Sequence, residues 1–176
     1  PNLTQTCGSS HDFGNGGWTS VGYTDDNASY RTFNCNVVDA NYLSVMKAQL
    51  SEGRNFSAEN PSDARRAVIV NEAFVKGHNL ENPLGKRVPG KRFADHEIVG
   101  VVKDFNYTSL YSKVEPLLLT MNVAIPLSGA ENINIENSPV PKLLIRLKPK
   151  NISESLAQLE GVWKKLNPGE QFSFSL

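Results

Sequence analysis

Residues 96–104 read His-Glu-Ile-Val-Gly-Val-Val-Lys-Asp and carry the strongest strand pattern in the chain. Valine and isoleucine fit the pleated surface of a sheet, so we expect a buried strand here. Gly100 interrupts the apolar run, which indicates a bulge or a close approach by another backbone segment. Asp104 is expected to accept hydrogen bonds from backbone amides where the strand turns away.

The chain before this strand predicts another strand, a short helix and a turn. Residues 67–70 read Ala-Val-Ile-Val, which is a short and fully apolar strand. Asn71 can cap a helix from Glu72 to about Gly77, because an asparagine side chain accepts from the free amides of a first helical turn. Asn82-Pro83-Leu84-Gly85 has the composition of a turn.

The chain after it predicts one more strand and then a linker. Pro116 precedes Leu117-Leu118-Leu119, and we expect this strand to continue through Val123 to Ile125. Residues 126–141 are interpreted as a linker, because three prolines bracket a polar stretch rich in Asn and Glu. The character of the chain changes at this point.

A strand–helix–strand unit follows the linker. Leucine and isoleucine alternate with other residues over 143–147, and Phe172-Ser173-Phe174-Ser175 alternates as a final strand. Between these two strands, Asn151 and Glu154 have the spacing of a capping box. The helix they open is expected to bury one apolar face, formed by Ile152, Leu156, Leu159, Val162, Trp163 and Leu166. This unit is one half of a split ferredoxin-like arrangement.

The first 36 residues are polar and predict strands at 4–9, 18–23 and 30–38, with a glycine-rich loop at 13–18. In the third strand, Phe33, Cys35 and Val37 form the apolar face of a half-buried strand.

A helix is expected to follow, with Asp39 at its N-cap. Its apolar residues recur at spacings of three and four: Tyr42, Leu43, Met46 and Leu50. Gly53 lies where a left-handed residue ends such a helix.

Composition narrows the functional classes. The 176 residues carry 18 Lys and Arg against 18 Asp and Glu, so the chain lacks the positive field that a non-specific nucleic-acid binder needs. It is 39% hydrophobic, enough for a core, but no apolar run is long enough to cross a membrane. Cys7 and Cys35 are interpreted as separate buried thiols, with a Cys7–Cys35 disulfide as the alternative.

The sequence contains no recognisable group of catalytic, cofactor-binding or metal-binding residues. His11 follows Cys7 by four residues in a Gly- and Ser-rich stretch, where no helix aligns the two side chains. His96 and its neighbour Glu97 point to opposite faces of a strand. The acidic stretch at 25–27 lacks the glycine and closing glutamate of a calcium loop, so we interpret it as a turn.

Two surfaces are candidates for partner contact. Four basic residues gather at what we interpret as a solvated hairpin tip, with docking to a partner as the alternative: Lys86, Arg87, Lys91 and Arg92. Trp18 beside the glycine-rich loop is either a contact residue or a core aromatic.

Several motifs in this order together resemble one family, although none is specific alone. They are Val38-Asp39-x-x-Tyr42-Leu43, Gly53-Arg54-x-Phe56, Val70-Asn71-Glu72, Asn82-Pro83-Leu84-Gly85-Lys86, Ile98-Val99-Gly100-Val101-Val102-Lys103-Asp104-Phe105 and Glu115-Pro116. The pattern is similar to the periplasmic core domain of MacB/FtsX-like ABC transporter permeases over about residues 35–176.

The resemblance implies an α+β fold with two parts. A porter-like βαβ module, incomplete in its N-terminal half, would comprise residues 1–12 and 142–176. A Sabre-like mixed α/β subdomain would be inserted between them, over residues 13–141. The chain would then be the periplasmic portion of a bacterial inner-membrane protein.

The resemblance also implies a mechanical function without catalysis by this chain. ATP-driven movement would pass to a periplasmic event such as efflux or the handling of a lipoprotein or peptide. The expected partners are an ABC ATPase subunit, a second permease copy, and a periplasmic adaptor or substrate protein.

In this interpretation the motif residues are structural: Asp39, Gly53, Arg54, Asn71, Glu72, Asn82, Pro83, Gly85, Gly100, Asp104 and Pro116. Arg54 is expected to pair with a buried carboxylate or carbonyl. Two alternatives remain open: a hydrolase with a distant triad, or a secreted glycan- or peptide-binding module that uses Trp18, Tyr23 and Tyr30.

Overall fold

The computed structural model describes residues 3–11, 18–107, 113–135 and 141–176. Its strands are β1 (Leu3–Ser9), β2 (Thr19–Thr24), β3 (Tyr30–Val37), β4 (Leu50–Gly53), β5 (Ala67–Asn71), β6 (Glu97–Val102), β7 (Leu117–Thr120), β8 (Asn132–Ile135) and β9 (Lys142–Leu147). Its helices are α1 (Tyr42–Met46), α2 (Asp63–Arg66), α3 (Glu72–Gly77), α4 (Ala124–Ser128) and α5 (Ile152–Leu166). The predicted loop at 13–17 and the linker residues 136–140 lie outside the described residues.

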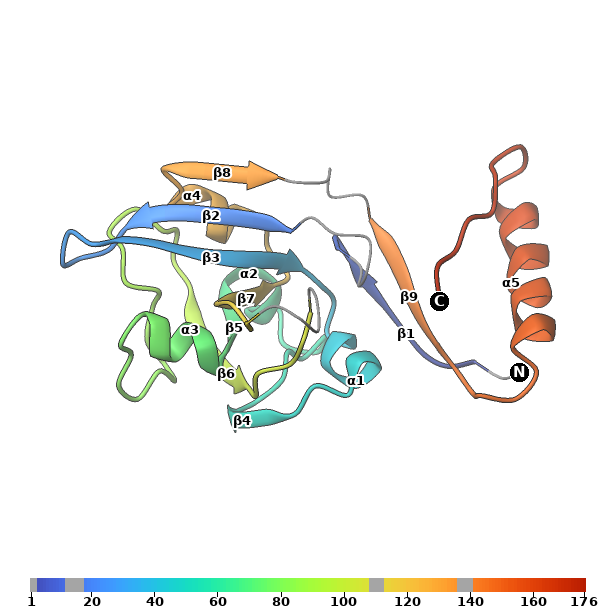
Figure 1. Ribbon diagram of the computed structural model, residues 1–176, viewed down its shortest axis with the longest axis horizontal. Coiled ribbons are helices and arrows are strands. Elements are labelled where there is room, and N and C mark those ends of the chain that lie inside the picture. The colour runs from blue at the N-terminus through green and yellow to red at the C-terminus, as the bar shows by residue number, and fades with distance from the viewer. Residues whose placement is uncertain (1–2, 12–17, 108–112, 136–140) are drawn as a thin grey trace.

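Two sheets organise the chain. Seven strands form a mixed sheet in the order β4-β6-β5-β7-β3-β2-β8, and β1 pairs with β9 in a separate antiparallel ribbon. This ribbon joins two segments more than 130 residues apart in the sequence, with Leu3 opposite Leu147 and Ser9 opposite Lys142. It projects from the body and carries α5 at its far end (Figure 1).

The central strands β5 and β7 of the seven-stranded sheet are buried on both faces. In β5 and β7, Ile69 and Leu119 lie in a cluster with α1, whereas Val70 and Leu118 lie in a second cluster with α3. Successive strand residues point to opposite faces. Continuous apolar runs such as residues 67–70 and 117–119 therefore form central strands, as the sequence predicts.

The third predicted strand is confirmed, and it is half-buried in its first half, where Tyr30 and Thr32 are exposed, but not in its second half. Phe33 and Cys35 enter the α3-side core, and Asn34 and Asn36 on the other face are also buried. These amides are buried because each has hydrogen-bond partners inside the protein, which burial of a polar group requires.

The helix expected to run from Asp39 to Gly53 is shorter. It ends at Met46, because Lys47 adopts a left-handed backbone with φ of 55° and turns the chain back. Gly53 consequently does not end a helix but closes edge strand β4, with φ of +74°. A side chain there would meet the carbonyl of Val99.

The strand predicted over residues 123–125 is also wrong, since Ala124–Ser128 is helix α4. Asn122 Oδ1 accepts a hydrogen bond from Ala124 N at 3.0 Å, and Pro126 suits a first helical turn, where its missing amide has no helical partner. The predicted linker likewise contains β8, which pairs with β2.

The last unit contains the expected β9 and α5, but not the final strand. Residues 172–175 form no ladder, and instead Phe172 lies against Trp163 at a centroid distance of 6.4 Å. Asn151 has a left-handed backbone, incompatible with the extended geometry of an N-cap, and its side chain caps no amide. The predicted buried face is wrong for Ile152, Val162, Trp163 and Leu166, which are 39–74% exposed.

Within the described residues, no helix is long and apolar enough to cross a membrane.

Candidate functional site at the joint between the two sheets

The ribbon meets the body of the protein at the end of β1. Ser9 bridges Val38, Ser10 N donates to Val37 O at 2.9 Å, and Asp39 N donates to Gly8 O at 3.2 Å. Side chains from α1 and β9 complete this contact. We call it the joint and define it by Gly8, Ser9, Ser10, Asn36, Asp39, Tyr42, Val45 and Arg146.

Asp39 fastens β1 to the body. Its Oδ2 accepts a hydrogen bond from Gly8 N at 2.7 Å, and its Oδ1 accepts one from Asn41 N at 2.8 Å. The expected N-cap role is therefore wrong: Asn41 occupies the cap position, and no side chain caps α1. The carboxylate instead forms two charge-assisted hydrogen bonds, one of which crosses to the ribbon.

Asn36 is a fully buried polar residue at the centre of the joint. Its Oδ1 accepts from Ser10 Oγ at 2.9 Å, and its Nδ2 donates to Ser9 Oγ at 3.0 Å and to Tyr42 Oη at 3.4 Å. One side chain thus links β3, β1 and α1. A buried network of this kind fixes a specific arrangement, because an unmade bond leaves a polar group without solvent.

Arg146 fastens the second strand of the ribbon. Its Nε donates to Val45 O at 2.8 Å, and its Nη2 donates to the same carbonyl. A guanidinium is well matched to a carbonyl of the last turn of a short helix, which has no helical partner and carries partial negative charge. Both strands of the ribbon are therefore held to the α1 region by charged side chains.

Cys7 and Cys35 are two separate, buried thiols, as the sequence predicts. Burial, together with the nearby Asp39 carboxylate, raises the pKa of Cys7 to about 11. Burial raises the pKa of Cys35 to about 12. Both thiols stay protonated near neutral pH and are therefore weak nucleophiles.

We expect both thiols to react with the disulfide reagent DTNB at least about tenfold more slowly in the folded chain than in guanidinium chloride. The measurement is the rate of thionitrobenzoate release at pH 7.5. Glu59→Cys, at an exposed position, serves as a fast-reacting control. Rapid reaction of native cysteines in the folded wild type would contradict the burial.

The three histidines have structural partners. His96 Nε2 accepts from Val88 N at 2.8 Å, and His11 Nε2 pairs with Thr19 Oγ1 at 3.0 Å. His78 Nδ1 donates to Phe74 O at 2.9 Å. Burial lowers the pKa of His78 and of His96, which favours neutral rings. The described residues contain no cluster of three His, Cys, Asp or Glu side chains that could hold a metal.

The acidic stretch forms the expected turn: Asp25 Oδ1 accepts from Asn27 N and Ser29 N, both at 2.9 Å.

The candidate contact residues divide into buried and exposed groups. Trp18 is only 5% exposed and packs on Tyr107 at a centroid distance of 4.6 Å, so it is a core aromatic. Tyr23 is buried too, which removes two of the three aromatic contacts that a secreted binding module would use.

The four basic residues are exposed, but no strands flank them to make a hairpin. Two of them support their own loop: Arg87 donates to Phe93 O at 2.6 Å, and Lys86 Nζ donates to Glu81 O.

The other motif residues lie in the body, away from the joint. Arg54 pairs with the buried carboxylate of Asp63, as expected, through contacts of 2.6 and 2.8 Å. Asn71 Oδ1 caps α3 by accepting from Phe74 N at 2.9 Å, and Asp104 Oδ1 accepts from Ala73 N at 2.8 Å.

The remaining motif positions shape turns and strand ends. Glu72 accepts from Ser51 Oγ at 3.0 Å. The turn predicted at Asn82–Gly85 lies one residue later, over Pro83–Lys86, where Lys86 N donates to Pro83 O at 3.1 Å. Pro116 O accepts from Asn34 N at 2.8 Å at the start of β7. At Gly100, an added Cβ would meet Arg54 O at 2.4 Å, which is the expected close approach.

Comparison with known proteins identifies the family. The family model for the MacB-like periplasmic core domain matches residues 12–162, most of the chain. The chain belongs to this family. It is the periplasmic domain of a MacB-like ABC transporter permease. A comparison with curated proteins gives no significant match.

Solved structures share the MacB-like fold at low sequence identity. The periplasmic region of MacB from Actinobacillus actinomycetemcomitans matches with a TM-score of 0.58 and 17% identity, over 94% of this chain and 68% of that one. A domain of a protein assigned as a permease from Porphyromonas gingivalis matches with a TM-score of 0.58 and 18% identity, over 94% of this chain and 71% of that one. The extracellular domain of the noncanonic ABC-type transporter YknZ from Gram-positive bacteria matches with a TM-score of 0.54 and 14% identity, over 94% of this chain and 76% of that one.

Sequence reasoning placed Asp39 in this MacB-like domain but missed the joint. The available signal was Asn36, an amide between Cys35 and Val37 inside a predicted strand. Arg146 gave no signal, since an arginine that alternates with leucine and isoleucine on a strand is ordinarily solvated.

Proposed function

We propose that this domain transmits ATP-driven conformational change in a MacB-like permease to a periplasmic event such as efflux or the handling of a lipoprotein or peptide. The observation that carries the proposal is the joint. Movement of the ribbon would reach the body through three side chains: Asp39 and Asn36 bind β1 by hydrogen bonds, and Arg146 of β9 binds the carbonyl of Val45. A buried polar network whose hydrogen bonds are all made is rigid, so the ribbon and the body are expected to move together.

In this proposal, each of two parts of the chain has its own role. Residues 1–12 and 142–176 form the porter-like module, and residues 13–141 form the Sabre-like subdomain that it moves. ATP hydrolysis belongs to the ABC ATPase subunit, and the moving unit is a dimer with a second permease copy. A periplasmic adaptor or substrate protein receives the movement.

The exposed apolar residues of α5 support a role inside a larger assembly. Val162 is 53% exposed, Trp163 39% and Leu166 74%, and all three lie along the last two turns of the helix. A continuous apolar stripe in water is unfavourable and marks a contact surface. We expect the rest of the permease assembly to cover it.

The test measures movement in the full-length permease with its ATPase subunit in lipid nanodiscs. Spin labels are placed either at Gln5 on the ribbon or at Glu59 on the body, both of which are exposed. One label per copy gives one distance across the dimer. We expect ATP binding to change the distance for both labels.

The joint variant Asp39→Ala separates transmission from movement of the ribbon. We expect the Gln5 distance to respond to ATP as before, whereas the response at Glu59 falls by more than half. Glu170→Ala, far from the joint, is the matched carboxylate control. A Glu59 distance that ignores ATP in the wild type, or an unchanged response in Asp39→Ala, would overturn the proposal.

A further inference from the structure

Strand β4 is an exposed edge of the seven-stranded sheet. It pairs with β6 on one side, and its other side carries no strand among the described residues. All four of its residues are exposed. A free edge of this kind offers unpaired backbone amides and carbonyls to an added strand.

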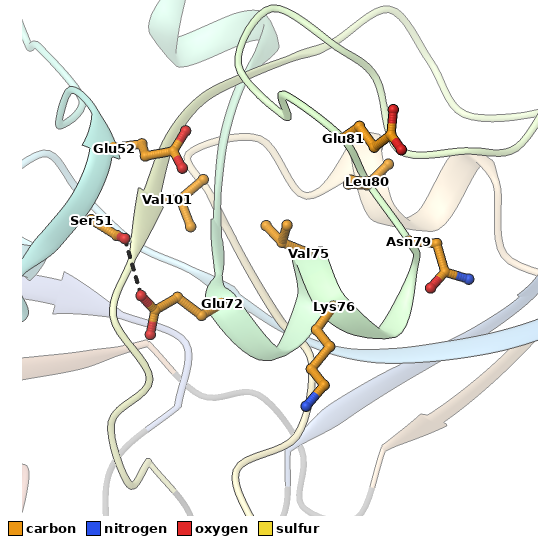
Figure 2. A pocket seen from close by; sticks show the side chains of 9 residues that line it. All are labelled: Ser51, Glu52, Glu72, Val75, Lys76, Asn79, Leu80, Glu81 and Val101. Carbon is orange, nitrogen blue, oxygen red and sulfur yellow. Dashed lines mark hydrogen bonds between the residues drawn. The ribbon is translucent and has the colours of Figure 1, made fainter.

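A groove of about 470 Å³ runs beside this edge, between β4 and α3. Its floor is apolar and comes from Val75, Leu80 and Val101. Figure 2 shows the side chains of Glu52 and Glu81 on the two sides of this floor. The volume lies within the range of sites that accept side chains or small ligands.

The irregular register of β4 shapes the groove. Leu50 lies opposite Val102 and Glu52 lies opposite Val101, so Ser51 is the extra residue of a bulge. Ser51 and Glu52 both line the groove, although successive strand residues normally point to opposite faces. Leu50 shares the other face with Val102 and is 37% exposed.

The residues that line the groove carry three carboxylates, those of Glu52, Glu72 and Glu81, against the one ammonium of Lys76. In the described part of the chain, no hydrogen bond or ion pair holds the carboxylates of Glu52 and Glu81. Glu72, by contrast, is engaged by Ser51 Oγ at 3.0 Å. Lys76 also lines the groove, but its ammonium extends away from Glu52 and Glu81 (Figure 2).

We propose that this groove binds an extended peptide segment of a partner protein in which basic and apolar residues alternate. The segment adds to β4 as a further strand. Its Lys or Arg side chains lie over Val75 and Leu80 and reach Glu52 and Glu81, and its apolar side chains cover Leu50. Backbone pairing supplies affinity, and the alternating side chains supply specificity.

The negative charge of Glu52 favours a basic peptide over a second copy of the chain as the occupant. Pairing of β4 with β4 of another copy would bring the Glu52 carboxylates of both copies to one face, where like charges repel. A basic segment removes that repulsion. The proposal does not depend on mechanical transmission, since it concerns binding by this chain without an ATPase.

The test uses the full 176-residue chain and three fluorescein-labelled peptides of sequence VKVKVK, VEVEVE and PKPKPK. Fluorescence polarisation measures affinity, and amide chemical shifts locate the site. We expect saturable binding of VKVKVK with shifts along β4 and α3. We expect at least tenfold weaker binding of VEVEVE, which has the wrong charge, and of PKPKPK, which cannot form a strand ladder.

The double variant Glu52→Gln and Glu81→Gln removes the two carboxylates with little change in shape. We expect it to weaken VKVKVK binding at least tenfold, whereas Glu59→Gln with Glu170→Gln makes the same change of net charge elsewhere and leaves binding unaltered. Equal weakening by both pairs, equal binding of PKPKPK, or shifts confined to another surface would each overturn the proposal.

Discussion

Replacement of Gly100 by alanine is expected to lower the free energy of unfolding by about 3 kcal/mol, the upper part of the usual range for overpacking. A Cβ at this position would lie 2.4 Å from Arg54 O and 3.3 Å from Arg54 C. Those atoms are backbone, and Arg54 N donates to Val99 O at 3.0 Å, so the segment cannot withdraw without loss of strand pairing.

The matched control is Gly161→Ala in α5, where an added Cβ meets nothing within 4 Å. Alanine is favoured over glycine inside a helix by about 1 kcal/mol, so this change should raise stability. Urea unfolding followed by circular dichroism measures both variants. Equal midpoints for Gly100→Ala and the wild type would show that the two backbones are not in close contact.

Gly100 also shows how far the sequence predicts the fold. The apolar runs at 67–70, 96–104 and 117–119 predict central strands because burial on both faces leaves a continuous pattern. Predictions failed where tertiary contacts override local pattern. Leu50 continues a helical periodicity, but residues 50–53 pair with β6 as a strand. Helix α5 is amphipathic, but much of its apolar face is exposed.

The candidate site was harder to predict than the fold. The joint depends on Gly8 meeting Asp39 and on Arg146 meeting Val45, which are contacts between segments 31 and 101 residues apart. Polar residues that are buried only through such contacts look like solvated residues in the sequence. Arg54 was the exception: pairing with a buried carboxylate or carbonyl was expected, and its partner Asp63 lies only nine residues away.

Replacement of Arg54 by alanine is expected to lower the free energy of unfolding by about 3 kcal/mol at pH 7, because it leaves the buried Asp63 carboxylate without its cation, although the Arg54 side chain is itself 49% exposed. The Asp63 side chain is 1% exposed and would keep its charge without the guanidinium. It retains hydrogen bonds from Ser57 N at 2.9 Å and Asn60 Nδ2 at 3.0 Å, which limit the loss. Arg66→Ala is the control: its guanidinium pairs with Asp95 and Glu97 at 3.6 Å in solvent, and the change should cost less than about 1 kcal/mol.

The effect of Arg54→Ala should also depend on pH in a defined direction. The hydrogen bond from Arg54 holds the pKa of Asp63 below its ordinary value. A carboxyl whose pKa is lower in the folded state stabilises the fold above its unfolded pKa of about 4, and this stabilisation disappears as pH falls through the folded value. The variant lacks the part of this contribution that comes from Arg54 and keeps the part that comes from Ser57 N, so the difference from wild type should shrink between pH 5 and pH 2. Urea unfolding across this range measures it, and a difference that stays constant would show that Asp63 does not ionise against Arg54.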